Sequence, residues 1–155
     1  ATAASVRSGA YERCLSALDG DIQVYAKACP LFVPLVENGR FRPGDTVIET
    51  VAAEYLAPLH ATGIDTLILG CTHYPLLSEI IANIMGNGVT LVDSGAAAAQ
   101  ALRRELDGRG LLSQRAHGEL TLYASDRPED FGVLAGQFLR RPLEDAVQHV
   151  DIERY

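Results

Sequence analysis

The chain has no tryptophan, one methionine and three cysteines in 155 residues, and its basic residues are outnumbered by acidic ones. An odd number of cysteines in a domain of this size argues against a disulfide framework and for a reducing compartment. A count of 13 Lys and Arg against 20 Asp and Glu argues against a nucleic acid as the main partner. No apolar run approaches the roughly 20 residues of a membrane span. We therefore expect a cytoplasmic protein that binds neither nucleic acid nor membrane.

Apolar segments and amphipathic segments alternate along almost the whole chain. Hydrophobic residues make up 48% and charged residues 21%, a composition typical of ordered globular proteins. The patterns predict strands at 21–28, 65–69, 89–93, 118–125 and 145–152, and helices at 8–18, 30–39, 45–63, 75–86, 94–106 and 128–139. This order is typical of the α/β class, with a mainly parallel sheet, flanking helices and ligands bound at the carboxyl ends of the strands.

The stretch 65–77, DTLILGCTHYPLL, ends an apolar strand at a glycine and then presents Cys71, Thr72 and His73 in a row. Because Pro75 favours the first turn of a helix, we expect Cys71 near the positive end of that helix, which favours a thiolate. Thr72 could donate its hydroxyl to an anion held there, and His73 could exchange a proton with the thiol or the ligand. The alternative is that Cys71 is a small buried apolar side chain.

The remaining cysteines and histidines give weaker signals. Cys14 lies on the apolar stripe of its helix and is expected in the core, and Cys29 is expected to be structural. No metal is expected, because Cys71 and His73 lack a second pair at metal-ligand spacing. Asp93 is interpreted as the N-cap of the helix that follows it. Three histidines are expected at the surface: His60, His117 and His149.

The stretch DTLILGCTHYPLL closely resembles the signature around the second catalytic cysteine of glutamate racemases. Three further segments match in order: SGAYERCL near the start, ACPLFVPLVENG at 28–39, and the VDSG strand end at 92–95. The resemblance is strong from about residue 1 to residue 94 and weak afterwards. Aspartate and hydantoin racemases share the GCT turn, whereas the HYPLL continuation is similar to the glutamate enzyme.

This resemblance implies a racemase that needs no cofactor, including no pyridoxal phosphate, and that interconverts L- and D-glutamate. Its D-glutamate would supply peptidoglycan synthesis and hence cell-wall biogenesis and cell shape. In the family, two cysteines flank the substrate α-carbon. One removes the α-proton as a thiolate, and the other returns a proton to the opposite face as a thiol.

The resemblance also implies roles for individual residues. The expected catalytic residues are Cys71, His73 and Glu37. The expected substrate-binding residues are Thr72, His73, Thr2 and Ser5. The last two lie where the family's residues approach the substrate carboxylate, although Ala1 replaces a glycine of the family pattern.

The amino-terminal half of the family, with its first catalytic cysteine, has no counterpart in this sequence, and neither Cys14 nor Cys29 stands in the family's Cys-Asn-Thr context. We therefore expect the carboxyl-terminal part of such a racemase, with a second α/β domain at 1–88 and a segment at 89–155 that would complete the first domain. Such a chain is expected to be inactive alone. Some apolar side chains of the segment should lack partners: Leu91, Leu120, Leu122 and Phe131. This lack favours a weakly folded tail, a homodimer or association with the missing part.

Two other functions stay open. In a cysteine hydrolase or acyl-transfer enzyme, Cys71 would be the nucleophile and His73 the base. That function is weakened because side chains two residues apart do not readily meet at a helix start, and the sequence indicates no third orienting residue. A module that binds an acidic amino acid or a protein without catalysis is the other alternative.

Overall fold

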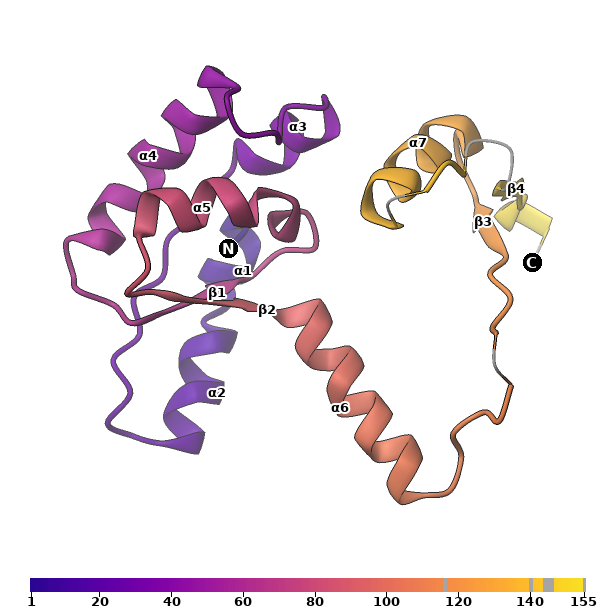
Figure 1. Cartoon of the computed structure of the whole chain (residues 1–155), viewed down its shortest axis with the longest axis horizontal. Helices are drawn as coiled ribbons and strands as arrows, with labels where there is room; N and C mark the ends of the chain where they lie inside the picture. The colour runs from indigo at the N-terminus through magenta and orange to yellow at the C-terminus, as the bar shows by residue number, and fades with distance from the viewer. Residues whose placement is uncertain (116, 140, 144–146, 155) are drawn as a thin grey trace. The chain divides into compact units, whose positions relative to one another are not determined.

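The computed structural model describes residues 1–115, 117–139, 141–143 and 147–154, and the chain forms two compact units, Ala1–Leu111 and Leu112–Tyr155. The first unit contains, in order, α1 (Ala3–Ser8), α2 (Ala10–Leu18), α3 (Phe32–Glu37), α4 (Thr46–His60), β1 (Thr66–Leu69), the 3-10 helix η1 (Tyr74–Leu77), α5 (Ser78–Met85), β2 (Thr90–Asp93) and α6 (Ser94–Gly108) (Figure 1). The second contains β3 (Leu122–Ala124), α7 (Pro128–Leu139), β4 (Val147–His149) and the 3-10 helix η3 (Ile152–Arg154).

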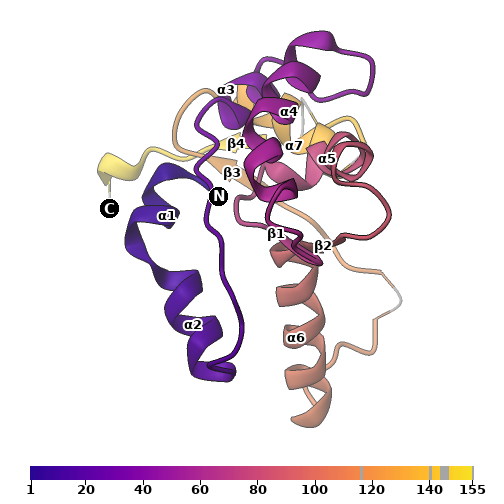
Figure 2. The ribbon, with the colours of Figure 1, turned by 90° about the vertical axis from the view of Figure 1, so that its left-hand side faces the viewer.

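Each unit contains one pair of parallel strands. In the first, β1 pairs with β2 from Thr66 opposite Thr90 to Leu69 opposite Asp93. In the second, β3 pairs with β4. Helices α4 and α5 lie on one side of β1, and α2 lies on the other side (Figures 1 and 2). The predicted α/β class, with parallel strands and flanking helices, is confirmed.

The helix ends follow from local chemistry. Asp45 begins α4 by accepting a hydrogen bond from the Val47 backbone nitrogen at 3.0 Å, and Asp93 begins α6 by accepting from Gly95 and Ala96. The predicted helix at 8–18 begins instead at residue 10, because Gly9 adopts a left-handed φ of 59° that ends α1 and separates it from α2.

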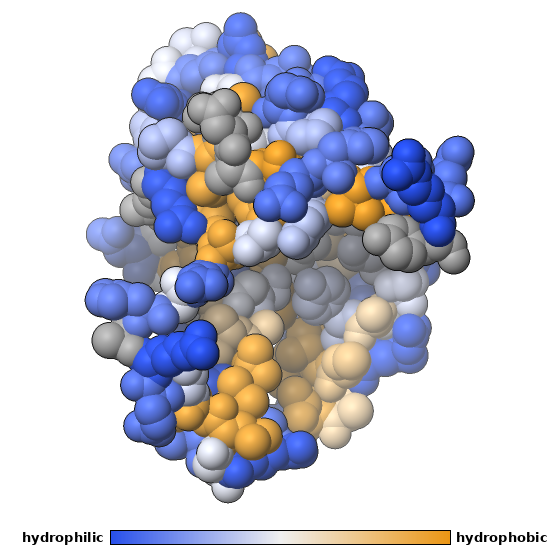
Figure 3. Space-filling model, turned by 90° about the vertical axis from the view of Figure 1, so that its right-hand side faces the viewer, coloured by the Kyte–Doolittle hydropathy of each residue, from blue (hydrophilic) through white to orange (hydrophobic). Residues whose placement is uncertain are grey.

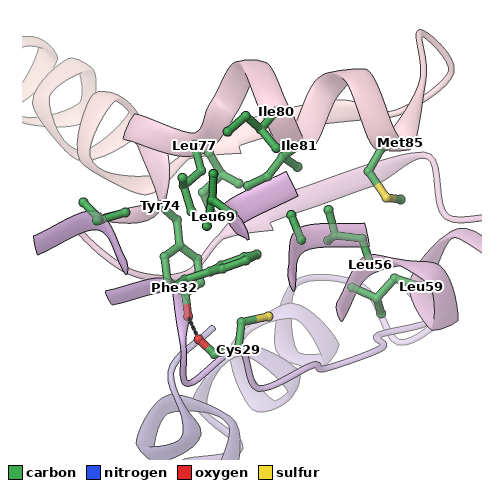
Figure 4. Packing of buried hydrophobic residues seen from close by; sticks show 13 residues of the cluster. Cys29, Phe32, Leu56, Leu59, Leu69, Tyr74, Leu77, Ile80, Ile81 and Met85 are labelled. Atoms are coloured by element: carbon green, nitrogen blue, oxygen red, sulfur yellow. Dashed lines mark hydrogen bonds between the residues drawn. The ribbon is translucent and has the colours of Figure 1, made fainter. Parts of the chain in front are cut away.

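The core of the first unit lies among α3, α4, β1 and α5. Its most buried side chains are Phe32, Val36, Ile48, Leu77, Ile80 and Ile81. Figure 4 shows the Tyr74 ring against Phe32, with its hydroxyl directed toward the Cys29 carbonyl. The two rings meet edge to face, with centroids 5.1 Å apart. Full burial of one large aliphatic or aromatic side chain contributes roughly 1.5–3 kcal/mol, so this cluster is the main source of stability in the unit.

The structure corrects three sequence-based expectations in the first unit. Residues 21–28 form no strand, because among the described residues their backbone bonds to other backbone only at Ala1 and, through the Ile22 nitrogen, at Asp19 in the preceding turn. Cys14 is exposed rather than in the core, because no residue of α2 is buried. Strand β1 was expected to be covered on both faces, yet Leu67 and Ile68 are only half-buried.

The apolar surface expected after residue 89 is present in part. Leu120 and Phe131 are exposed, and Figure 3 shows hydrophobic side chains exposed among hydrophilic ones on one face of the molecule. Leu91 is half-buried because it packs against the core of the first unit, and Leu122 is half-buried.

The predicted boundary at residues 88 and 89 falls inside the first unit, between α5 and β2, because β2 pairs with β1. That residues 89–155 complete a further domain stays a prediction. None of the helices in the described part of the chain is long and apolar enough to span a membrane.

Candidate active site

The turn after β1 holds the cysteine that the sequence singled out. The Cys71 backbone nitrogen donates to the Leu69 carbonyl at 2.9 Å, and the Tyr74 nitrogen donates to the Cys71 carbonyl at 3.2 Å. Pro75 lies in the single 3-10 turn η1, and the α-helix begins only at Ser78. Cys71 therefore precedes a 3-10 turn that leads directly into α5, rather than the first turn of the α-helix itself.

His73 lies between a thiol and a carboxylate. Its Nδ1 is 3.9 Å from the Cys71 Sγ and 3.2 Å from the Thr72 Oγ1. Its Nε2 is 3.2 Å from the Glu37 Oε1, which comes from the end of α3. The Cys71 and His73 side chains thus approach each other, contrary to the sequence-based expectation, and Glu37 supplies the third group that the sequence did not indicate for this role.

The proton positions on His73 follow from what each neighbour can accept. An ionised Glu37 carboxylate has no proton to donate, so the Nε2 that faces it carries the hydrogen. In the neutral ring, Nδ1 is then an acceptor that faces Cys71 and Thr72. The cluster can therefore take a proton from the Cys71 thiol, and Glu37 stabilises the imidazolium that forms.

Thr2 and Ser5 lie at the start of α1. The two hydroxyls are 2.9 Å apart, and the Thr2 Oγ1 accepts from the Ser5 backbone nitrogen at 3.2 Å as the N-cap of that helix. Ala1 packs beside the end of β1, since a Cβ placed on Gly70 would lie 3.0 Å from the Ala1 Cβ. Thr2 follows Ala1 in the chain, and Cys71 follows Gly70. The contact between Ala1 and Gly70 therefore brings the backbone of Thr2 near that of Cys71.

The Tyr74 side chain links η1 by hydrogen bonds to the start of the chain and to the segment before α3, a role that the sequence analysis missed. Its hydroxyl is 3.1 Å from the Ala1 carbonyl and 3.0 Å from the Cys29 carbonyl. Burial, reinforced by Cys29 and Cys71, raises the pKa of Tyr74 well above its ordinary value, so the hydroxyl stays protonated as a donor. The sequence signal that could have indicated this role was the position of an aromatic residue between His73 and Pro75.

The other sequence-predicted positions lie outside this cluster. Cys29 is buried in the core, as expected, and burial raises the pKa of its thiol. His60, His117 and His149 are exposed, as expected. Among the described residues, no group of three or more histidines, cysteines and carboxylates could hold a metal ion.

Comparisons with known proteins agree on one family. No protein-family model matches the chain. It is 44% identical to a glutamate racemase from Desulforudis audaxviator, over 96% of this chain and 56% of the relative. It is 38% identical to a glutamate racemase from a Thermoanaerobacter strain, over 100% of this chain and 58% of the relative.

Solved structures match equally well. Glutamate racemase from Francisella tularensis in complex with D-glutamate has a TM-score of 0.87 and 34% identity, and the match covers 100% of this chain and 57% of that chain. Glutamate racemase from Thermus thermophilus in complex with β-chloro-D-alanine has a TM-score of 0.81 and 39% identity, over 98% of this chain and 55% of that chain. The chain thus spans about half the length of the proteins it matches, and it is a relative of the glutamate racemases that corresponds to a carboxyl-terminal portion of them.

Proposed function

We propose that this chain is the portion of a glutamate racemase that carries one of its two proton-transfer thiols, Cys71. The observation that supports this most is the line of Cys71, His73 and Glu37 in a chain whose relatives are glutamate racemases. The parent protein interconverts L- and D-glutamate in the cytoplasm without a cofactor and supplies D-glutamate for peptidoglycan. A homodimer stays a prediction.

In the proposed reaction, the Cys71 thiolate removes the α-proton of one glutamate enantiomer and becomes a thiol. In the reverse direction, the thiol returns the proton to the same face of the α-carbon. His73 sets the protonation state of Cys71 through Nδ1, and Glu37 holds the imidazole by its Nε2. Thr72, Thr2 and Ser5 offer hydroxyls to the substrate carboxylates.

Racemisation also needs an acid or base on the opposite face. The chain contains only two other cysteines, and Cys14 is exposed on α2 whereas Cys29 is buried in the core. Neither suits a thiol that must meet substrate opposite Cys71. We infer that the second thiol comes from the rest of the parent protein, so the chain alone should not racemise glutamate.

The test is to restore racemisation by adding the missing part. The chain would be co-expressed with the amino-terminal portion of the Desulforudis audaxviator relative, and conversion of L- to D-glutamate would be followed by polarimetry. We expect activity that Cys71→Ser abolishes and that the matched control Cys14→Ser leaves intact. A stable complex without activity, or activity that survives Cys71→Ser, would overturn the proposal.

The same geometry supports a second candidate, a thiol hydrolase with Cys71 as nucleophile, His73 as base and Glu37 as orienting group. It is weakened because the Cys71 backbone N–H donates to the Leu69 carbonyl and so does not serve an oxyanion. Mass spectrometry after incubation with p-nitrophenyl acetate distinguishes the two functions. An acyl group on Cys71 that turns over would favour the hydrolase.

A further inference from the structure

The carboxylate that faces His73 comes from the end of a very short helix. Glu37, whose Oε1 lies 3.2 Å from the His73 Nε2, is the last residue of α3, a helix of six residues. A helix of this length is not stable by itself. The Glu37 side chain is 46% exposed, so its own packing does little to hold it. The position of the carboxylate therefore depends on what holds the backbone of α3.

The core holds α3 by one face. Phe32 and Val36 are fully buried, and α3 packs against η1, the turn that follows His73. These contacts fix the body of the helix against the core. Glu37 lies one residue beyond Val36, at the end of the helix, where helices fray. The contact with His73 thus needs a further constraint on the last turn of α3.

The turn after Glu37 supplies that constraint through two backbone hydrogen bonds. The Gly39 nitrogen donates to the Val36 carbonyl at 2.9 Å, and the Arg40 nitrogen donates to the Leu35 carbonyl at 2.9 Å. This pair of bonds is a Schellman motif, in which the residue after the C-cap adopts a left-handed conformation. Gly39 occupies that position with a φ of 78°.

Two side chains of the same turn add further ties. The Asn38 Nδ2 donates to the Pro34 carbonyl at 2.7 Å. The Arg40 Nη1 lies 2.9 and 3.2 Å from the two carboxylate oxygens of Asp45, the N-cap of α4. Both ties are exposed and are expected to contribute little. The backbone bonds made by residues 39 and 40 are therefore the main constraint on the end of α3.

Glycine is needed at residue 39 for its conformation and not for space. A Cβ placed there would meet no atom of the described residues within 4 Å. A positive φ is nevertheless strained for a residue with a side chain, and asparagine tolerates it better than alanine. In Gly39→Ala, relief of this strain requires the left-handed turn to open, with loss of the bonds to Val36 and Leu35. That opening would release the end of α3 that carries Glu37.

We infer that Gly39 is a positioning residue for the reaction proposed above, because its left-handed turn holds the end of α3 where Glu37 contacts His73. Gly39 acts through Glu37 and needs no contact of its own with the substrate. The catalytic consequence rests on the proposed function. The positioning itself does not, since the contact between Glu37 and His73 is observable in this chain without substrate.

NMR of this chain alone tests the positioning. Nuclear Overhauser effects between the His73 ring protons and the Glu37 γ-methylene protons should weaken by at least about twofold in Gly39→Ala, because a frayed helix end spends less time in the closed turn. Gly39→Asn should retain them, since asparagine tolerates the left-handed conformation.

The matched control is Gly63→Ala, in the turn after α4. Gly63 also has a positive φ, of 72°, and the described residues leave the same open space around it. Both alanine variants should lower the urea midpoint by a similar amount, about 0.5 M, because they carry the same kind of strain. Gly63→Ala should leave the Overhauser effects between His73 and Glu37 unchanged.

Kinetics of the reconstituted racemase test the catalytic consequence. Gly39→Ala should lower kcat/KM by about threefold to tenfold, and Gly39→Asn should restore most of it. The double variant Gly39→Ala/Glu37→Gln should be no slower than Glu37→Gln alone, because a positioning residue has no effect once the carboxylate is gone. Gly63→Ala should leave kcat/KM unchanged.

Three results would overturn the inference: unchanged Overhauser effects in Gly39→Ala, an equal weakening in Gly63→Ala, or losses of kcat/KM that multiply in the double variant. Weaker effects in Gly39→Ala without racemisation by the reconstituted parent would support the positioning of Glu37 and contradict the proposed function. The two failures are thus distinct.

Discussion

Replacing Tyr74 with phenylalanine removes one hydroxyl from the centre of the first unit and leaves the ring that packs against Phe32. The hydroxyl has one proton for two carbonyls, those of Ala1 and Cys29. Each carbonyl keeps another donor in the variant: the Cys29 nitrogen at 3.0 Å for Ala1 and the Phe32 nitrogen at 3.2 Å for Cys29. The loss is therefore that of one neutral hydrogen bond, about 1–1.5 kcal/mol, and not the larger cost of an orphaned buried carbonyl.

Urea unfolding followed by circular dichroism measures this loss. A destabilisation of this size should lower the midpoint by about 0.5–1 M, with an unchanged slope. The control is Tyr55→Phe, whose hydroxyl accepts a longer, exposed bond from Leu31 at 3.4 Å and should cost under about 0.5 kcal/mol. Equal losses in the two variants, or a Tyr74→Phe loss above about 3 kcal/mol, would refute the assigned role of Tyr74.

Three further predictions concern the core, the pH range and the site. Leu77→Ala should lower the free energy of unfolding by about 2–5 kcal/mol in urea titrations, whereas Leu18→Ala, at an 81% exposed position, should change it by less than about 0.5. Burial raises the pKa of the Cys29 thiol, so the contribution of the protonated thiol to folding stability is complete below its ordinary pKa of 9.0. That contribution is lost as the pH rises through the higher pKa of the folded state. Thermal midpoints should therefore fall more steeply above pH 9.0 in the parent than in Cys29→Ala. In the reconstituted racemase, Glu37→Gln should lower kcat/KM by about tenfold or more through its contact with His73, with unchanged stability because the Glu37 side chain is 46% exposed.

The sequence predicted α4, α6, α7 and β1 well because their signals are local, whereas α1 was not predicted. Asp45 and Asp93 are N-caps in the structure, and the apolar run at 66–69 became β1. Residues 21–28 had equally good alternation, but a strand also needs a neighbour, and the described residues offer only Ala1. Cys14 is exposed because α2, although amphipathic in sequence, has no buried residue.

The cluster around Cys71 was only partly predictable from the sequence. The motif at 70–73 indicated a reactive turn, and the family resemblance implied Glu37. The 3.2 Å contact between Glu37 and His73 depends on how α3 packs beside η1, which no local pattern encodes. The 3-10 form of η1 was missed because Pro75 is equally suited to the first turn of an α-helix.

The measurement that tests the central claim most directly is α-proton exchange of L- and of D-glutamate in heavy water, followed by NMR with this chain at high substrate concentration. If Cys71 is a proton-transfer thiol that works on one face of the substrate, one enantiomer should exchange faster than in buffer. That exchange should vanish in Cys71→Ser and persist in Cys14→Ser. Exchange that survives Cys71→Ser, or equal exchange of both enantiomers, would contradict the account.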